Sequence, residues 1–141
     1  MSPLTLAQSY LQKCELRLAI LQFAFDRPGW SDVVREAQEC AELAFKGMLR
    51  AVGRDPPKVH DVSGALLQAR ALFPAEIDTD RMARISQVLR RDRGLSFYGA
   101  DDVIPTDAYT QEDAAVAIAQ AHEAVAAARV VIGRAGLGPI G

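Results

Sequence analysis

The chain of 141 residues has few cysteines and no excess of either charge. Its two cysteines, Cys14 and Cys40, stand among apolar residues in helix-like patterns, so we expect buried free thiols rather than a disulfide framework or a metal site. The 16 basic and 18 acidic side chains nearly cancel, which argues against a protein that coats nucleic acid through its overall field. Any contact with a polyanion must therefore depend on a local cluster of cations.

Sequence signatures of common enzyme and nucleotide sites are also missing. The chain has no GxGxxG or GxxxxGK[ST] phosphate loop, no GxSxG nucleophile turn and no HExxH pair. Neither His60 nor His122 has the Cys/His spacing around it that favours a metal ion. We therefore expect no metal, no cofactor and no catalytic residue that these motifs would identify.

Features of a signal peptide or a membrane span are missing from the amino-terminal stretch. Lys13, Glu15 and Arg17 interrupt its apolar pattern, whereas both kinds of segment need an unbroken apolar run. We therefore expect a cytoplasmic protein without a membrane partner.

Helical periodicity is what the sequence does have. Apolar residues recur in steps of three and four along most of the chain, and no segment has the sustained alternation of a strand. The expected helices span about 3–25, 31–52, 62–72, 76–95 and 110–132. This pattern predicts an all-α, up-and-down bundle of four long helices plus one short helix in a connection.

One domain accounts for the length, since half of the residues are apolar and can bury a single core. We expect the bundle to occupy residues 1–132 and the glycine-rich stretch 133–141 to be a flexible tail. Alanine dominates the last helix, which permits close helix approach but leaves less apolar area per residue. A homodimer that shares helical faces would add to the buried area.

Turn and capping residues indicate where the helices begin and end. We expect Ser31 to be the N-cap of the second helix and Gly53 to end it. Asp61 is the expected cap of the short helix. Thr110 and Asp113 have the spacing of a capping box at the start of the last helix.

The densest basic cluster lies in SQVLRRDRGLSFYGADD, residues 86–102. Arg90, Arg91 and Arg93 offer guanidinium forks for phosphate oxygens, and Tyr98 offers a ring on which a base could stack. The alternative is a solvated helix end whose arginines are neutralised by the two aspartates that close the stretch.

Two further polar residues have simple structural interpretations. Lys46 follows Glu42 by one turn on a polar stripe, which is typical of an exposed ion pair. His60 lies in the connector PPKVHD, where a local hydrogen bond that fixes the loop is the first interpretation.

Two stretches together resemble a known family. REAQECAELAFKGMLRAVGRDPPKVHDVSGALL, residues 35–67, is similar to the central signature of HEPN domains, the higher eukaryote and prokaryote nucleotide-binding family. In that signature, a helix of the type A-Q-x-A-x-E-K-A-x-K-A-L-L precedes a G-x-x-P-P-x-T-H-D-L connector. YTQEDAAVAIAQAHEAV, residues 109–125, is similar to the family's final helix. The matching positions of the first stretch are Ala37, Gln38, Glu42, Ala44, Lys46, Leu49, Gly53, Pro56, Pro57, His60 and Asp61.

The resemblance implies a helical bundle that usually dimerises and is often encoded beside a minimal nucleotidyltransferase. It also implies one of two activities, nucleotide binding or RNA cleavage by the RNase of a toxin–antitoxin pair. RNase members resemble one another in an R-x(4–6)-H motif near the end of the fourth helix, where histidine transfers a proton and arginine stabilises the phosphorane. This chain has the arginines, but no histidine lies between His60 and His122.

Three functions therefore stay open. We favour a dimeric module in which the helix arginines, helped by Tyr98, Lys46 and His60, bind a nucleotide or an RNA phosphate. The second is a divergent RNase toxin in which His60 or His122 reaches the arginines through folding or dimerisation. The third is a protein-interaction partner of a nucleotidyltransferase.

Overall fold

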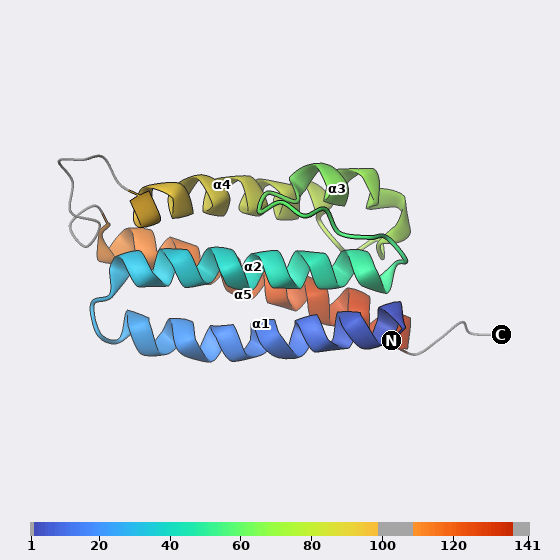
Figure 1. The fold of residues 1–141 in the computed structure, drawn as a ribbon, viewed down its shortest axis with the longest axis horizontal. Coiled ribbons are helices and arrows are strands. Elements are labelled where there is room, and N and C mark those ends of the chain that lie inside the picture. Colours follow the sequence, from blue (N-terminus) through green and yellow to red (C-terminus); the bar gives the residue numbers. More distant parts are fainter. Residues whose placement is uncertain (1, 99–108, 137–141) are drawn as a thin grey trace.

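The fold is a bundle of antiparallel helices (Figure 1). The computed structural model describes residues 2–98 and 109–136, and the side chains of all of these except 92–98. Its elements are α1 (Pro3–Phe25), α2 (Trp30–Ala51), α3 (Ser63–Gln68), a 3-10 turn (Arg70–Leu72), α4 (Thr79–Tyr98) and α5 (Gln111–Gly136). The described ranges contain no strand. The expected all-α bundle of four long helices and one short helix is confirmed.

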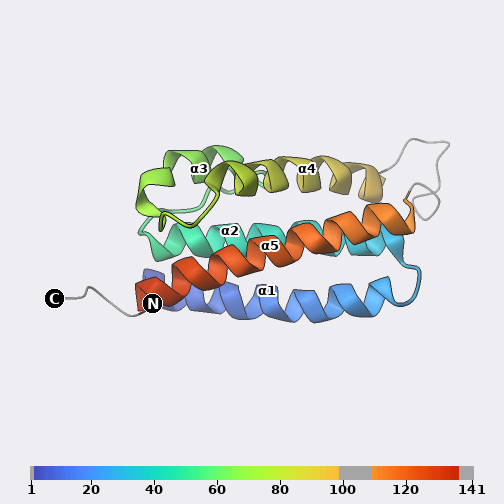
Figure 2. The same cartoon turned by 180° about the vertical axis from the view of Figure 1, so that it is seen from behind.

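Helix α2 occupies the centre of the bundle. It lies between α1 and α4 and packs against α5, which crosses behind α1 and α2 in Figure 1 and in front of them in Figure 2. The short α3 lies against α4. Because α2 contacts every other long helix, its side chains decide how the bundle is assembled.

Local capping explains where α1 and α5 begin. The hydroxyl of Ser2 accepts the Thr5 N–H at 3.1 Å, and Pro3 occupies the first turn, where its missing N–H removes no helical bond. At α5, the Thr110 hydroxyl accepts the Asp113 N–H at 3.1 Å, and the Asp113 carboxylate accepts the Thr110 N–H at 2.9 Å. The predicted capping box is confirmed.

The expected starts of α2 and α4 were wrong. Ser31 does not cap α2, because the helix already begins at Trp30, and the first helical bond runs from the Val33 N–H to the Gly29 carbonyl at 2.9 Å. Contact between the rings of Phe25 and Trp30, with centroids 5.5 Å apart, closes the turn early and leaves Ser31 buried inside the first helical turn.

Helix α4 begins at Thr79, three residues later than expected. The carboxylate of Asp78 accepts the Arg81 N–H at 3.0 Å, which is the bond that a capping side chain makes. The helix then continues to Tyr98 rather than ending near residue 95. Capping by Asp78 therefore outweighs the apolar pattern that suggested an earlier start.

Helix α2 ends where Gly53 was expected to end it. Gly53 has φ +79°, a conformation that L side chains rarely adopt. Its N–H bonds to the Arg50 carbonyl at 3.0 Å, and the Arg54 N–H bonds to the Leu49 carbonyl at 2.9 Å. These are the two bonds of a Schellman motif, which releases the chain into the connector before α3.

The core contains the apolar faces that the periodicity predicted. Large buried side chains come from all four long helices and from α3, and include Leu21, Val34, Phe45, Met48, Leu66, Ile85, Leu89 and Val125. Alanines of α5 allow it to lie close to α1 and α2. By length and hydropathy alone α5 could cross a membrane, but half of its most apolar stretch is buried inside the bundle, as in a core helix.

Both cysteines are buried free thiols, as expected. The Cys14 thiol donates to the Leu11 carbonyl at 3.2 Å, and the Cys40 thiol donates to the Cys14 carbonyl at 3.3 Å. Burial raises the pKa of Cys14 to about 11, and it also raises the pKa of Cys40. Both side chains therefore act as small core residues that join α1 to α2.

The expected tail falls partly outside the described residues. Helix α5 continues to Gly136, so the first four residues assigned to a flexible tail are helical, and residues 137–141 lie outside the description. Residues 99–108 also lie outside it.

Candidate functional site

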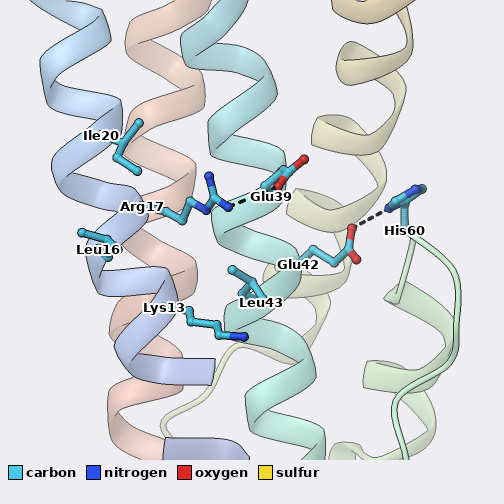
Figure 3. A pocket seen from close by; sticks show the side chains of 8 residues that line it. All are labelled: Lys13, Leu16, Arg17, Ile20, Glu39, Glu42, Leu43 and His60. Carbon is cyan, nitrogen blue, oxygen red and sulfur yellow. Dashed lines mark hydrogen bonds and ion pairs between the residues drawn. The ribbon is translucent and has the colours of Figure 1, made fainter. Parts of the chain in front are cut away.

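Glu42 of α2 is the centre of the polar cluster that joins the connector to the bundle. Its carboxylate accepts hydrogen bonds from Gln38 Nε2 at 2.8 Å, from Lys46 Nζ at 2.9 Å and from His60 Nδ1 at 2.8 Å. Figure 3 shows the bond to His60 bridging α2 and the connector. Burial disfavours the charged carboxylate, but these three hydrogen bonds and the Lys46 charge outweigh it and lower the pKa of Glu42.

Asp61, the next residue after His60, links the same connector to α4. Its carboxylate accepts the Ser63 N–H at 3.0 Å and the Ser86 hydroxyl at 3.1 Å, and the Ser86 oxygen in turn accepts the Val62 N–H at 3.0 Å. The expectation that Asp61 caps α3 was wrong, because Val62 occupies the capping position, but the Asp61 carboxylate still binds the first N–H of the helix. The dipeptide His60–Asp61 therefore connects α2 to α4.

Arg90 lies one helical turn after Ser86 and is half-buried. Partial burial of Asp61 opposes its ionisation, but the hydrogen bonds from Ser63 and Ser86 and the positive charge of Arg90 outweigh it. The pKa of Asp61 is therefore lowered.

The structure brings two of the six residues proposed from the sequence directly together, and a third lies on α4, the helix to which the connector is bound. Lys46 and His60 share the Glu42 carboxylate, and Arg90 acts on the neighbouring Asp61. The Lys46–Glu42 pair exists, but it is not the exposed pair that the pattern suggested, because each side chain is only 16% exposed. His60 does fix the loop, although its partner lies 18 residues away instead of nearby.

The other proposed residues lie farther along α4. Arg91 is exposed and interacts with another side chain or backbone group. Arg93 and Tyr98 belong to the helical backbone of α4, but their side chains are outside the described set. His122 is exposed on α5 and has no hydrogen bond or ion pair with another described residue.

One edge of the His60 ring is available to a ligand. The side chain is 51% exposed, and its Nδ1 is engaged by Glu42. A neutral ring that donates Nδ1–H to Glu42 presents Nε2 as an acceptor, whereas a protonated ring presents an Nε2–H donor. The protonated form suits a phosphate oxygen.

A groove of about 450 Å³ lies beside this cluster, between α1 and α2 (Figure 3). Its lining residues are Lys13, Leu16, Arg17, Ile20, Glu39, Glu42, Leu43 and His60. The α1 wall contributes two apolar side chains and two cations, while the α2 wall contributes two carboxylates and Leu43. His60 and Glu42 therefore belong both to the polar cluster and to the rim of the groove.

The sequence indicated Lys46, His60 and Arg90, but it did not indicate the side chains that bind their surroundings together. Glu42 was treated as the partner of Lys46 and as a match to the family signature but not as the acceptor for His60, and Ser86 was not considered. Glu42 stands one turn from both Gln38 and Lys46 on the polar stripe of α2, and that spacing was the available signal. Nothing in the local sequence signalled Ser86, because its partner belongs to a connector 25 residues earlier.

Comparison with known proteins bears directly on this arrangement. The family model described as HEPN domain matches residues 7–131. Searches of curated proteins and of solved structures returned no match. The matched span begins in α1 and ends in α5, so it contains α2, the connector, α4 up to its end, and the Glu42 and Asp61 contacts. Since this span is most of the chain, the protein belongs to the HEPN domain family.

Proposed function

We propose that this HEPN domain is a cytoplasmic, homodimeric module that binds the phosphate of a nucleotide or RNA at the surface formed by the connector and α4. The observation that carries the proposal is the attachment of the step His60–Asp61 to α2 on one side and to α4 on the other. This attachment joins the connector that carries the His60 imidazole to α4, the helix that carries Arg90.

Charge balance at this surface depends on the arginines. Lys46 is paired with Glu42, and the positive charge of Arg90 contributes to the lowered pKa of Asp61. An arginine has five N–H donors in a planar fork, so Arg90 can serve a carboxylate with some of them and a phosphate oxygen with others. Arg91 and Arg93 add positive charge on the same helix. The expected interaction is therefore local and sensitive to salt.

Assembly with other chains is part of the proposal and rests on family membership. We expect the chain to form a homodimer, and a minimal nucleotidyltransferase is the candidate protein partner. A sedimentation mass twice the chain mass of 15.3 kDa at micromolar concentration would support the homodimer, and a mass near 15.3 kDa would remove it.

Binding of a fluorescent adenine nucleotide and of a short RNA, measured by anisotropy at low salt, tests the proposal. We expect the double variant Arg90→Ala/Arg93→Ala to lose at least about tenfold in affinity, which corresponds to about 1.4 kcal/mol for lost charge-assisted hydrogen bonds. His60→Ala should weaken binding less, because it removes one donor. Added salt should weaken ligand binding by the parent protein more than ligand binding by the double variant.

Arg84→Ala is the matched control, because Arg84 is an exposed arginine on the same helix, before the proposed site. It should leave affinity within about twofold of the parent, and circular dichroism should show equal helicity for all variants. Unchanged affinity in the double variant, or no binding by the parent at low salt, would contradict the proposal.

RNA cleavage is the second candidate activity. The observation that favours it is the exposed His60 ring, which is bound to the Glu42 carboxylate. We expect little metal-independent cleavage, because the R-x(4–6)-H spacing lacks its histidine. Robust cleavage of a short RNA that is lost in His60→Ala or His122→Ala would establish a divergent RNase instead.

A further inference from the structure

The outer face of α1 carries an apolar stripe that the described part of the bundle leaves open. Leu16, Ile20 and Phe23 are spaced by four and three residues, so they share one side of the helix. Their exposed fractions are 64%, 37% and 60%. Leu16 and Ile20 also form one wall of the groove of about 450 Å³, opposite Leu43 of α2 (Figure 3). Contiguous exposed apolar side chains beside a groove are typical of a surface that another molecule covers.

A cation stands at each end of this stripe. Lys13 precedes Leu16 by three residues and makes no hydrogen bond or ion pair with any other described residue. Beyond the end of α1, Arg27 folds back over the Phe23 ring, with the guanidinium carbon 3.5 Å from the ring centroid, and it donates to the Phe23 carbonyl at 3.0 Å. Neither cation is paired with a carboxylate among the residues described.

Carboxylates on the opposite wall of the groove already have cationic or hydrogen-bonding partners. Glu39 lies 3.9 Å from Arg17, and Glu42 is bound by Lys46 and His60. Arg17 also contacts Glu36 at 3.0 Å. Lys13 and Arg27 are therefore the cations at the two ends of the stripe, and the exposed Asp26 carboxylate beside Arg27 accepts a hydrogen bond from Gln22 Nε2 at 2.9 Å.

This charge pattern disfavours a second copy of the chain as the molecule that covers the stripe. A twofold axis near Ile20 would pair two α1 helices antiparallel, with each residue opposite the one equally far on the other side of the axis. Lys13 of one copy would then meet Arg27 of the other at both ends of the seam. Like charges at both ends oppose such a pairing.

We infer that the α1 face docks an amphipathic helix of another protein, whose apolar side chains cover Leu16, Ile20 and Phe23 and whose acidic side chains pair with Lys13 and Arg27. The two cations are about four helical turns apart along the sequence, so the partner needs acidic residues near both ends of a seam about 14 residues long. This helix-in-groove mode uses apolar anchors for affinity and terminal charges for selection. The inference is independent of phosphate binding at α4.

Two synthetic helical peptides of about 18 residues test this inference. Both carry leucines along one face, and one has glutamates at its two ends where its twin has lysines. Fluorescence anisotropy at low salt should show the acidic peptide binding at least about tenfold more tightly than the basic one. The charge-reversal variant Lys13→Glu/Arg27→Glu should invert this preference.

A second variant tests the apolar contribution. Leu16→Asp/Phe23→Asp should abolish binding of the acidic peptide without changing helicity or the melting temperature by more than a few degrees, since both side chains are exposed in the free chain. Val116→Asp is the matched control, because Val116 is an exposed apolar residue of α5 outside the groove. It should bind the acidic peptide like the parent.

Three results would overturn the inference. The first is equal affinity for the two peptides, or acidic-peptide binding that persists in Leu16→Asp/Phe23→Asp. The second is a parent homodimer that this double variant converts to monomers, which would assign the stripe to a second copy. The third is binding of the parent to vesicles of equal phosphatidylcholine and phosphatidylglycerol, lost in the same variant, with no peptide binding, which would assign the stripe to a lipid surface.

Discussion

Replacement of Gly47 by leucine is expected to destabilise the bundle by about 3 kcal/mol. Gly47 lies on α2 where that helix meets α1 and α5. A Cβ atom at this position would lie 3.1 Å from Ile132 Cδ1, 3.1 Å from Tyr10 Cβ and 3.5 Å from the Ala7 carbonyl oxygen. Leucine would force α1 and α5 away from α2, which also separates the buried residues around them. Urea unfolding followed by circular dichroism measures this change in the free energy of unfolding.

Gly133→Leu is the matched control, because Gly133 is an exposed glycine of α5 with no atom within 4 Å of its ideal Cβ position. Leucine there should stabilise the helix by up to about 0.8 kcal/mol through its higher helix propensity. Equal effects of the two substitutions would show that the three helices do not approach one another closely at Gly47.

Loss of the Glu42 carboxylate is the second large expected effect. Glu42→Met leaves the Lys46 ammonium, only 16% exposed, without a carboxylate, and it leaves His60 and Gln38 without their acceptor. We expect a loss of about 2 kcal/mol, because removing one partner of a part-buried pair costs more than the pair contributes. The connector should also loosen, which faster amide hydrogen exchange at Val62 and Ser63 would report.

A double variant distinguishes the destabilisation caused by the unpaired Lys46 charge from the destabilisation caused by lost packing. Glu42→Met/Lys46→Met removes both charges at similar volume, so it should recover at least half of the stability lost in Glu42→Met. Glu39→Met, one turn earlier on α2, removes a more exposed carboxylate and should cost less than about 0.5 kcal/mol. A double variant less stable than Glu42→Met would contradict the role given to the Lys46 charge.

The same carboxylate gives stability a defined dependence on pH. Because the pKa of Glu42 is lowered from its ordinary value of 4.5, the unfolded chain binds a proton more readily than the folded chain. The stabilisation is therefore complete above about pH 5 and is lost as pH falls through the lowered pKa. Asp61 acts in the same direction from its ordinary value of 3.8. Between pH 6 and pH 3, the free energy of unfolding should therefore fall less in Glu42→Met than in the parent.

Features decided within one turn of helix were the ones that the sequence predicted well. The Thr110–Asp113 capping box and the Gly53 terminus depend on residues a few positions apart, and both are found where expected. Ser31 failed as a cap because contact between Phe25 and Trp30 starts α2 one residue earlier than the cap rule allows. That contact depends on how two helices meet, which a local pattern does not contain.

In the candidate site, too, the local features were predicted and the contacts between elements were not. The family resemblance indicated Lys46 and His60, and the basic stretch indicated Arg90. Their common support could not be predicted from spacing, since His60 reaches Glu42 across the connector and Asp61 reaches Ser86 on α4. Periodicity assigns a residue to a face of its own helix, whereas the neighbour that faces it is decided by packing among α2, α3 and α4.

Phosphate binding beside the connector is the central claim, and chemical-shift mapping tests it most directly. An adenine mononucleotide should be titrated into ¹⁵N-labelled protein at low salt, with observation of the backbone amides and the His60 ring. We predict the largest shifts at His60, Asp61 and the amides around Arg90, and none along the apolar stripe of Leu16, Ile20 and Phe23. Shifts confined to the stripe, or no shift at the connector and α4 at millimolar nucleotide, would contradict the account.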